Sequence, residues 1–411
     1  MKKSVLFLMS ALITFGATVQ THASARLDSL SLDVRQVDDI DLIWLYPNKV
    51  LEYKNTADFR LSSNGLLGNG TNEWGGFIAD ESSLGGVVGV YVNRPNILNT
   101  PAWGILGGFV GAYDPLESYT SIPGNDGEQG TSGPGDTISN IIDIFWAQNA
   151  GGADLGFHFN YGDNGVQSLG NWETEQMALA MGLGFGAVGP FSQLNVHLDY
   201  ATDFTTQIGL STKNHDNGVY SLKLGGLGQL DVNETNYFKV FADVSMDQDN
   251  MTDLDNYNFS DTTLVVGTSW DQKVDGGKGL IATGLVGEYV GSTVKGSYTD
   301  DGWVLLWDGA VEEEVASWIT VRAGLEGAIT AREYYTLGSP TFTQDTNTTP
   351  PYTGYQFSTG FGINWSNFVL DANVSSGSFE SSVNHVQPGN GLFFNNGNLL
   401  TVAGMDLRYK F

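Results

Sequence analysis

Apolar and polar residues alternate with a period of two along most of the chain. The clearest example is residues 399–411, where the odd positions are mostly apolar and the even positions become charged at Asp406 and Arg408. Such alternation predicts a β-strand with one apolar face. The strand runs to the final residue, and Tyr409 and Phe411 end its apolar face.

The same pattern recurs throughout the chain. Clear alternation predicts strands at residues 154–161, 177–185, 193–200, 237–246, 319–329 and 355–365. Weaker patterns suggest strands at residues 74–80, 84–93, 103–113, 138–147, 204–212, 219–230, 262–270, 280–290, 303–310 and 368–374. Residues 51–61 are a further candidate, and residues 303–310 could instead form a loop. Because single-chain bacterial barrels have an even number of strands, we expect about sixteen, with 14 and 18 as the alternatives.

Connections between these strands fall into two length classes. Short connections are predicted at residues 81–83, 148–152, 188–190 and 366–367. Long ones, rich in Gly, Asn, Thr and acids, are predicted at residues 114–137, 162–172, 247–261, 330–353 and 375–398. Short periplasmic turns and long extracellular loops are typical of transmembrane barrels. The fold class is therefore predicted as all-β, a transmembrane antiparallel up-and-down β-barrel.

The last strand resembles the C-terminal strand of bacterial outer-membrane β-barrel proteins, which typically ends in Phe after alternating aromatic or apolar residues. The resemblance implies that Tyr409 and Phe411 form an assembly signal for the barrel-assembly machinery. It also implies contact with outer-membrane lipid and lipopolysaccharide. Further aromatic residues at strand ends, Tyr161, Tyr200 and Trp365, suit the bilayer interface. An amphipathic edge strand of a soluble sandwich is the alternative.

The first 25 residues read as a signal peptide. Lys2 and Lys3 precede an apolar run at residues 5–17, and Ala23-Ser24-Ala25 offers a small-residue cleavage site. We expect the mature chain to begin at Arg26, with Ser24 as the alternative. The expected location is the outer membrane of a Gram-negative-type bacterium.

Residues 26–63 differ from the rest of the chain. They are dense in charge, and their apolar run at residues 43–46 stops at Pro47. We expect either a plug in the lumen or an irregular first strand, followed by the barrel at residues 64–411. Asp38-Asp39 ahead of Pro47 resembles FadL-like transporters, where paired acids precede an Asn-Pro turn. In this chain the order is reversed, Pro47-Asn48, so the resemblance does not extend to that dipeptide.

Charge and composition exclude several classes of function. The formal net charge is −28, from 18 basic and 46 acidic residues. Without Lys2 and Lys3 the count is 16 against 46, or −30. Such a chain repels phosphate, so nucleic acid is not an expected partner. There is no cysteine, which excludes disulfides and thiolate metal sites.

The polar faces of the predicted strands define a candidate pore lining. Its members are Asp154, His158, Asn195, His197, Asp199, Lys239, Asp243, Arg322, Glu326, Asp406 and Arg408. Charged rings set the field of a water-filled pore and select among ions. The excess of acids favours cations. The alternative is that these side chains pair with one another and only stabilise the wall.

The residue pattern bears on metal binding and on catalysis. His158 and His197, near Asp154 and Asp199, suit a metal site or an acid–base pair, but a solvated lumen histidine is the commoner outcome. No nucleophile with a local base signature is present in the sequence, so we expect no enzyme activity.

A loop rich in carboxylates is a candidate calcium site. Asp247, Asp249, Asp253 and Asp255 lie in one short stretch, and oxygen ligands at this density suit Ca²⁺. The stretch lacks the glycine and terminal glutamate of an EF-hand loop, and a plain solvated acidic loop is the alternative. No other cofactor is expected.

The predicted function is a porin-like outer-membrane channel for passive diffusion of small hydrophilic solutes or ions. General porins are commonly trimers, so the resemblance extends to a homotrimer. One alternative is a FadL-like transporter of hydrophobic compounds, which predicts a plugged lumen. The other is a non-conducting barrel that serves as an adhesin or structural component.

Overall fold

The computed structural model describes twelve ranges of the chain. They are residues 24–62, 73–81, 85–92, 139–169, 172–188, 191–207, 213–251, 259–294, 298–336, 346–375, 379–381 and 402–411.

Strands make up nearly all of the described chain. They are β1 Thr56–Ser62, β2 Glu73–Glu81, β3 Gly86–Val92, β4 Ser139–Ala150, β5 Ala153–Leu169, β6 Trp172–Val188, β7 Phe191–Gln207, β8 Lys213–Asp231, β9 Asn236–Met251, β10 Phe259–Val274, β11 Gly279–Val294, β12 Tyr298–Ala316, β13 Ile319–Thr336, β14 Thr346–Trp365, β15 Phe368–Ser375, β16 Phe379–Ser381 and β17 Val402–Lys410. The short helices are α2 Ala25–Leu30, α3 Leu42–Leu45, η1 Pro47–Tyr53 and η4 Asp275–Gly277. Within the described ranges, no helix is long and apolar enough to span a membrane.

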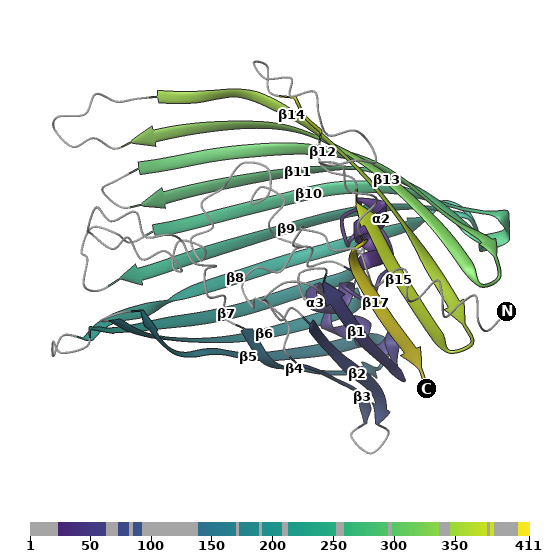
Figure 1. Ribbon diagram of the computed structural model, residues 1–411, viewed down its shortest axis with the longest axis horizontal. Helices are drawn as coiled ribbons and strands as arrows, with labels where there is room; N and C mark the ends of the chain where they lie inside the picture. The colour runs from purple at the N-terminus through teal and green to yellow at the C-terminus, as the bar shows by residue number, and fades with distance from the viewer. Residues whose placement is uncertain are drawn as a thin grey trace.

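The strands form one closed antiparallel sheet (Figure 1). From β1 to β15 each strand pairs with the next one in the sequence, β15 also pairs with β17, and β1 closes the ring by pairing with both β2 and β17. β15 and β16 both pair with β14, so they occupy one position in the ring. The barrel therefore has sixteen strands, which confirms the predicted fold and strand number.

Short connections gather at one end of the barrel, here called the turn end. β4 and β5 are joined through residues 151–152, β12 and β13 through 317–318, and β14 and β15 through 366–367. The start of β1 and the end of β17 lie at this end too, with Thr56 opposite Lys410. The predicted short connection at 366–367 falls there, and so does the one at 148–152, of which 148–150 belong to β4. Those at 81–83 and 188–190 lie mostly outside the described residues. The opposite end is called the far end.

Strands reach further toward the far end than the sequence pattern predicted. Residues 162–172 were predicted as a long loop, but β5 and β6 form a hairpin in which Leu169 lies opposite Trp172. β9 likewise enters the predicted loop at residues 247–261, and β13 and β14 enter the one at 330–353. A strand that extends past the bilayer needs no apolar face, so its alternation disappears although its backbone pairing continues.

Individual strand predictions also need correction. Residues 303–310, which we considered a possible loop, lie in the 19-residue strand β12. Residues 204–207 continue β7, so the predicted separate strand at 204–212 is wrong. Residues 51–61 divide between η1 and β1. The predicted strand at 103–113 and the predicted loop at 114–137 lie outside the described residues.

Residues 24–55, here called the lumenal segment, lie inside the barrel (Figure 1). α2 packs against β12 to β15 and β17, while η1 packs against β3 to β6 on another part of the wall. α2 begins where the Ser24 hydroxyl accepts a hydrogen bond from the Leu27 amide, and it ends at Ser31, whose φ is 49°. Pro47 starts η1, where its missing N–H costs nothing. The segment of residues 26–63 therefore holds this lumenal part and then β1.

Candidate functional site: the barrel lumen

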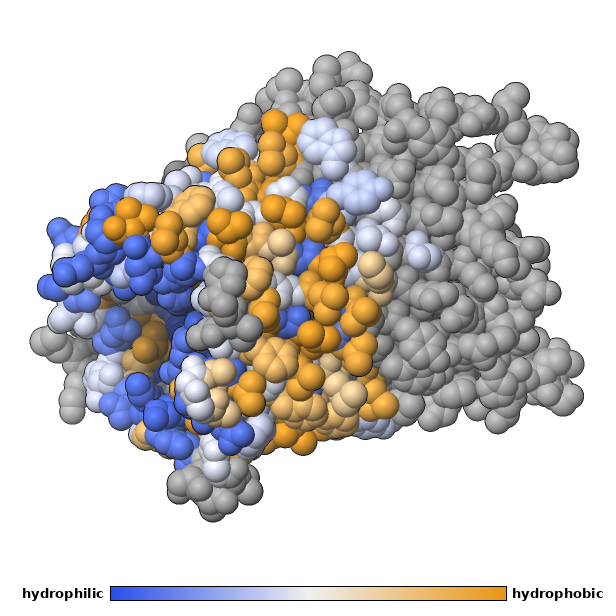
Figure 2. Space-filling model, turned by 180° about the vertical axis from the view of Figure 1, so that it is seen from behind, coloured by the Kyte–Doolittle hydropathy of each residue, from blue (hydrophilic) through white to orange (hydrophobic). Residues whose placement is uncertain are grey.

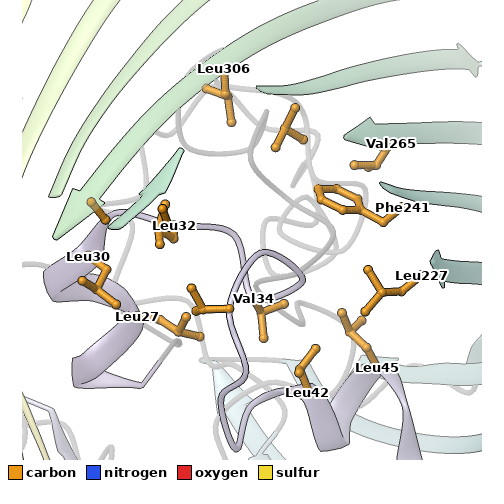
Figure 3. Close-up of a cluster of buried hydrophobic side chains, with 14 of the residues drawn as sticks. Leu27, Leu30, Leu32, Val34, Leu42, Leu45, Leu227, Phe241, Val265 and Leu306 are labelled. Atoms are coloured by element: carbon orange, nitrogen blue, oxygen red, sulfur yellow. The ribbon is translucent and has the colours of Figure 1, made fainter. Parts of the chain in front are cut away.

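An inward-facing apolar area on β8 to β12 receives one side of the lumenal segment (Figure 3). The wall contributes Leu227, Phe241, Val265, Ala282, Val286, Leu306 and Ala310. The segment contributes Leu27, Leu30, Leu32, Val34, Val37, Leu42, Leu45 and Tyr46. We call this contact the apolar side. Alternation had predicted a polar inward face for β9. Phe241 lies on that face although it is apolar, and it is only 1% exposed because the segment covers it.

A second, aromatic contact lies on β2 to β5. Trp44 from α3 packs edge-on against Tyr91, Phe145 and His158, with ring centroids 5.1, 5.0 and 5.8 Å apart. The His158 ring stacks on Phe145 at 4.3 Å, and its Nε2 lies 2.9 Å from Asp143 Oδ1. The indole of the segment is thus fixed on three sides by the wall.

Arg35 anchors the segment within the apolar side. Its guanidinium is fully buried, pairs with Asp33 at 2.6 Å and also pairs with Asp243 of β9. The same group lies over the Phe241 ring, 4.6 Å from the centroid. Burial acts against the charged form, but Asp33 and Asp243 outweigh it and raise the pKa of Arg35 above its usual value. Arg35 is therefore charged at every accessible pH.

Wall side chains also bind the backbone of the segment. Asn195 Nδ2 and His197 Nε2, both on β7, donate to the Leu45 carbonyl oxygen at 2.8 and 2.9 Å. Lys239 Nζ donates to the Gln36 carbonyl oxygen at 2.7 Å and pairs with Asp271 at 3.0 Å. A carbonyl acceptor places the proton of His197 on Nε2. These residues hold the segment and do not line open water.

A cluster of charged side chains joins α2 to β12, β13, β15, β17 and β1. It comprises Arg26, Asp39, Asp41, Asp58, Arg60, Glu312, Arg322, Asp371, Asp406 and Arg408. We call it the charged cluster. Glu312 bridges Arg26 at 2.9 Å and Arg322 at 2.6 Å, and Asp371 links Arg322 to Arg408.

The two aspartates that the segment brings into this cluster titrate differently. Burial disfavours the charge on Asp39, but Arg26, Arg408 and Arg60 outweigh that cost and lower its pKa. For Asp41, burial and the neighbouring charge of Asp39 raise the pKa despite its pairing with Arg60.

Inward-facing glycines let the segment approach the wall. A Cβ at Gly156 would overlap the backbone at Pro47 and Asn48, and one at Gly324 would overlap the Leu30 carbonyl. No other residue type fits these positions without moving the segment. Glycine within a strand can mark a bend or the close approach of another backbone, and at these two positions it marks close approach.

Beyond the segment, toward the far end, the next inward positions are polar. They include Asn160, Ser245, Thr263, Glu288 and Glu326. Glu326 lies opposite Asp308 in the register of β12 and β13. Lys223, opposite Ser245, adds a positive charge at the same level, so the described wall above the segment is hydrophilic and carries both acids and a base.

The structure places most of the predicted pore-lining residues against the lumenal segment. His158, Asn195, His197, Lys239 and Asp243 contact it directly. Arg322, Asp406 and Arg408 belong to the charged cluster, and Glu326 lies above the segment.

Two predicted residues lie apart from the segment's contacts. Asp154 is at the turn end, where it accepts a hydrogen bond from Asn149 at 2.7 Å. Asp199 lies in β7, with Ala180 and Ser221 as its strand neighbours.

Several lumen residues escaped the sequence reasoning. Arg60, Asp143, Asp271, Asp308 and Glu312 are all inward-facing and pair with the segment or with residues that touch it. These residues lie on the polar faces of β1, β4, β10 and β12. The alternation in these four strands was weak or ambiguous, so their polar faces were not used to predict lumen residues.

The predicted calcium loop is only partly described. Asp247 and Asp249 lie in β9, where Asp247 is opposite Asp261 of β10. Asp253 and Asp255 lie outside the described residues. Among the described residues, no group of three or more histidines or acids is placed to hold a metal.

The outside of the wall carries an apolar band, next to a more hydrophilic turn end (Figure 2). Leu198, Leu285 and Met246 are among its exposed members. Aromatic rings edge the band at the turn end. Trp318 and Trp365 are 53% and 70% exposed, and Tyr409 packs on Phe368 with centroids 4.5 Å apart.

A closed barrel with an apolar outer band and interfacial aromatics satisfies its backbone within the sheet and presents a face to lipid. The chain is a transmembrane β-barrel protein. Phe411, which is 55% exposed, ends the closing strand of this barrel, and its amide donates to the Asn55 carbonyl at 2.9 Å.

Comparison with known proteins adds little to this identification. No protein-family model and no curated protein matches the chain. The solved structures it resembles include the ferric-catecholate import receptor Fiu from E. coli K12, at 10% identity and a TM-score of 0.39, covering 58% of this chain and 52% of that one. The siderophore receptor PiuA from Acinetobacter baumannii matches at 8% identity and a TM-score of 0.37, covering 58% and 47%.

A third barrel, the FrpB iron transporter from Neisseria meningitidis, matches at 10% identity and a TM-score of 0.36, covering 89% of this chain and 68% of that one. The chain spans about half the length of the first two of these proteins. These overlaps are too small to transfer an activity from any of them to this chain.

Proposed function

We propose that this barrel carries small hydrophilic solutes or ions across the outer membrane, and that the lumenal segment closes its lumen at rest. The observation that carries the proposal is that the segment contacts the wall all round at the turn end. α2 meets β12 to β15 and β17, η1 meets β3 to β6, and hydrogen bonds reach β7 and β9. Free diffusion past this segment, as in an open porin, is not expected while it is docked.

The nature of the solute follows from the wall beyond the segment. Its inward side chains are polar: amides and hydroxyls such as Asn160 and Thr263, carboxylates such as Glu288 and Glu326, and the ammonium group of Lys223. Such a lining stays hydrated and attracts cations. We therefore expect hydrophilic solutes, with cations preferred over anions once the lumen is open.

Conductance in planar bilayers tests the proposal. Wild-type protein should be silent or open only briefly, because the segment stays docked. Arg35→Met leaves Asp33 and Asp243 without their cation, so it should release the segment and give steady ohmic steps. Lys49→Met, which removes a partly exposed pair with Glu52 that does not reach the wall, should behave like the wild type.

Two results would contradict the proposal. Large steady steps from the wild type, equal to those of Arg35→Met, would mean an open porin. Silence from every variant, including correctly inserted Arg35→Met, would mean a non-conducting structural or adhesin barrel.

A specific observation also favours a second candidate, transport of hydrophobic compounds. The lumenal segment covers an inward apolar area that includes Phe241, Val265 and Leu306, and this area would be exposed if the segment moved. A plugged lumen is what a FadL-like transporter predicts. Saturable binding of a fluorescent fatty acid by Arg35→Met, lost in Arg35→Met/Leu306→Gln, would support this candidate; equal binding by both variants would remove it.

A further inference from the structure

The first residues of the lumenal segment are buried among carboxylates. Ser24 is only 1% exposed, and its backbone nitrogen lies 2.5 Å from Asp41 Oδ2. The next nitrogen, of Ala25, donates to Asp406 Oδ2 at 2.6 Å. Two adjacent backbone nitrogens therefore each contact a buried acid, one from the segment and one from β17.

The surrounding charges do not balance. The charged cluster holds four guanidiniums and six carboxylates, as its members show. Buried charges are costly unless they are compensated. Asp41 has Arg60 on one oxygen and the Ser24 nitrogen on the other, so a positive charge at Ser24 would lie where acids are in excess.

We infer that the leader is removed between Ala23 and Ser24, and that the new α-ammonium of Ser24 forms an ion pair with Asp41 inside the lumen. In this step a signal endopeptidase and one water hydrolyse the peptide bond. The C–N bond breaks, Ala23 keeps the carboxylate, and Ser24 keeps the nitrogen, which is protonated.

The competing site, after Ala25, fits the structure poorly. A chain that begins at Arg26 loses both nitrogens that contact Asp41 and Asp406. It also loses the Ser24 hydroxyl, which caps α2 by accepting from the Leu27 amide at 3.2 Å. Loss of such a cap destabilises a helix end by about 0.5–2 kcal/mol.

Cleavage at Ser24 also couples maturation to docking. Before cleavage, the Ser24 nitrogen is a neutral amide. Afterwards it is a cation with three donors, and hydrogen bonds between ionised partners are roughly twice as strong as neutral ones. The mature segment should therefore dock more firmly than the precursor. This inference does not depend on what the barrel transports.

The cleavage site is tested by intact mass and N-terminal sequencing of the full protein extracted from outer membranes. The expected first residues are Ser-Ala-Arg-Leu, beginning at Ser24. A mature chain that begins at Arg26, or at any other residue, would overturn the inference.

The ion pair is tested by labelling amines of the folded protein at neutral pH with a water-soluble acylating reagent. An exposed α-amine has an ordinary pKa of about 7.7–8.0 and should react faster than lysine. The buried Ser24 amine should instead react about ten-fold more slowly than exposed Lys410. Labelling at or above the Lys410 rate would contradict the ion pair.

A matched pair of variants assigns the protection to Asp41. Asp41→Asn should speed Ser24 labelling, whereas Asp38→Asn, at a side chain 69% exposed, should leave it unchanged. Equal rates in both variants would remove Asp41 as the partner. If Asp41→Asn does not assemble, the wild-type rate of Ser24 labelling relative to Lys410 still tests whether the amine is buried in an ion pair.

Discussion

The lumenal segment is held by two unlike contacts. On the apolar side, Leu27, Leu45 and their neighbours cover buried residues of β8 to β12 (Figure 3). In the charged cluster, Arg26 and Asp39 of the segment join ion pairs that run from β12 round to β1. The first contact is strong because it removes apolar surface from water. The second is strong because buried arginines pair with buried carboxylates.

This difference indicates which contact can be released. Apolar burial responds little to protons or salt under physiological conditions. Ion pairs in a lumen depend on every partner being present and charged, since removal of one leaves another buried and uncompensated. We therefore interpret the apolar side as the contact that keeps the segment docked. We interpret the charged cluster as the contact whose disruption can release it. The predictions below test that division.

The largest effect is expected from Arg35→Met. Arg35 is the cation in the apolar side that compensates Asp33 and Asp243, and its loss should weaken docking by about 3–5 kcal/mol. Limited proteolysis should then cut the segment of barrels inserted in vesicles. Lys49→Met should remain as resistant as the wild type, and equal resistance of Arg35→Met would show that this pair does not anchor the segment.

Leu306→Ala should have the next largest effect. Leu306 is 3% exposed and packs in the apolar side, so its truncation should cost about 2–5 kcal/mol of docking free energy. The neighbouring Leu305, which faces outward and is 39% exposed, provides the control Leu305→Ala. Equal protease sensitivity of the two variants would mean that the segment does not bury Leu306. The Leu306→Ala effect should also be insensitive to salt.

Gly324→Ala tests the close approach of the segment to the wall. The added methyl would overlap the Leu30 carbonyl, and overpacking of this kind costs about 1–3 kcal/mol. Gly309→Ala on the adjacent strand is the matched control, because a Cβ there has no neighbour within 4 Å. Hydrogen exchange of the α2 amides should speed up in the first variant only; unchanged exchange in both would argue against the contact.

The smallest effect is a pH dependence carried by Asp39. The pKa of Asp39 is lower in the docked state than in a released segment. The charge on Asp39 therefore stabilises docking fully when the pH is above the ordinary aspartate pKa of about 3.9. This contribution is lost as the pH falls through the lowered pKa. Protease resistance of the segment should therefore fall more steeply below about pH 4 in the wild type than in Asp39→Asn. Parallel pH profiles would exclude Asp39 as the source of the acid sensitivity.

Sequence reasoning predicted the wall better than its contents. Alternation is visible wherever one face meets lipid, so β9, β13 and β17 were placed from residues alone. It fails for the far-end parts of β5 and β6, where water lies on both sides. Arg322 and Asp243 were correctly placed on inward faces.

The lumenal contacts were harder to predict. A period of two assigns Phe241 and Leu306 to a polar face, and only a second layer of protein explains why they are apolar. Gly324 gave no signal in the sequence, because a glycine needed for close approach looks the same as one needed for curvature. Pairings such as Arg35 with Asp243 join residues far apart in the chain and depend on how the segment folds back into the lumen.

The most direct test of the central claim, that residues 24–55 close the lumen, is conductance with the segment locked in place. Ser31 and Ser358 have their hydroxyl oxygens 2.5 Å apart, and the chain has no cysteine, so Ser31→Cys/Ser358→Cys can form a single disulfide between segment and wall. Combined with Arg35→Met, this variant should stay silent when oxidised and give steady ohmic steps after reduction. The same steady steps before and after reduction, with the disulfide confirmed by mass, would contradict the account.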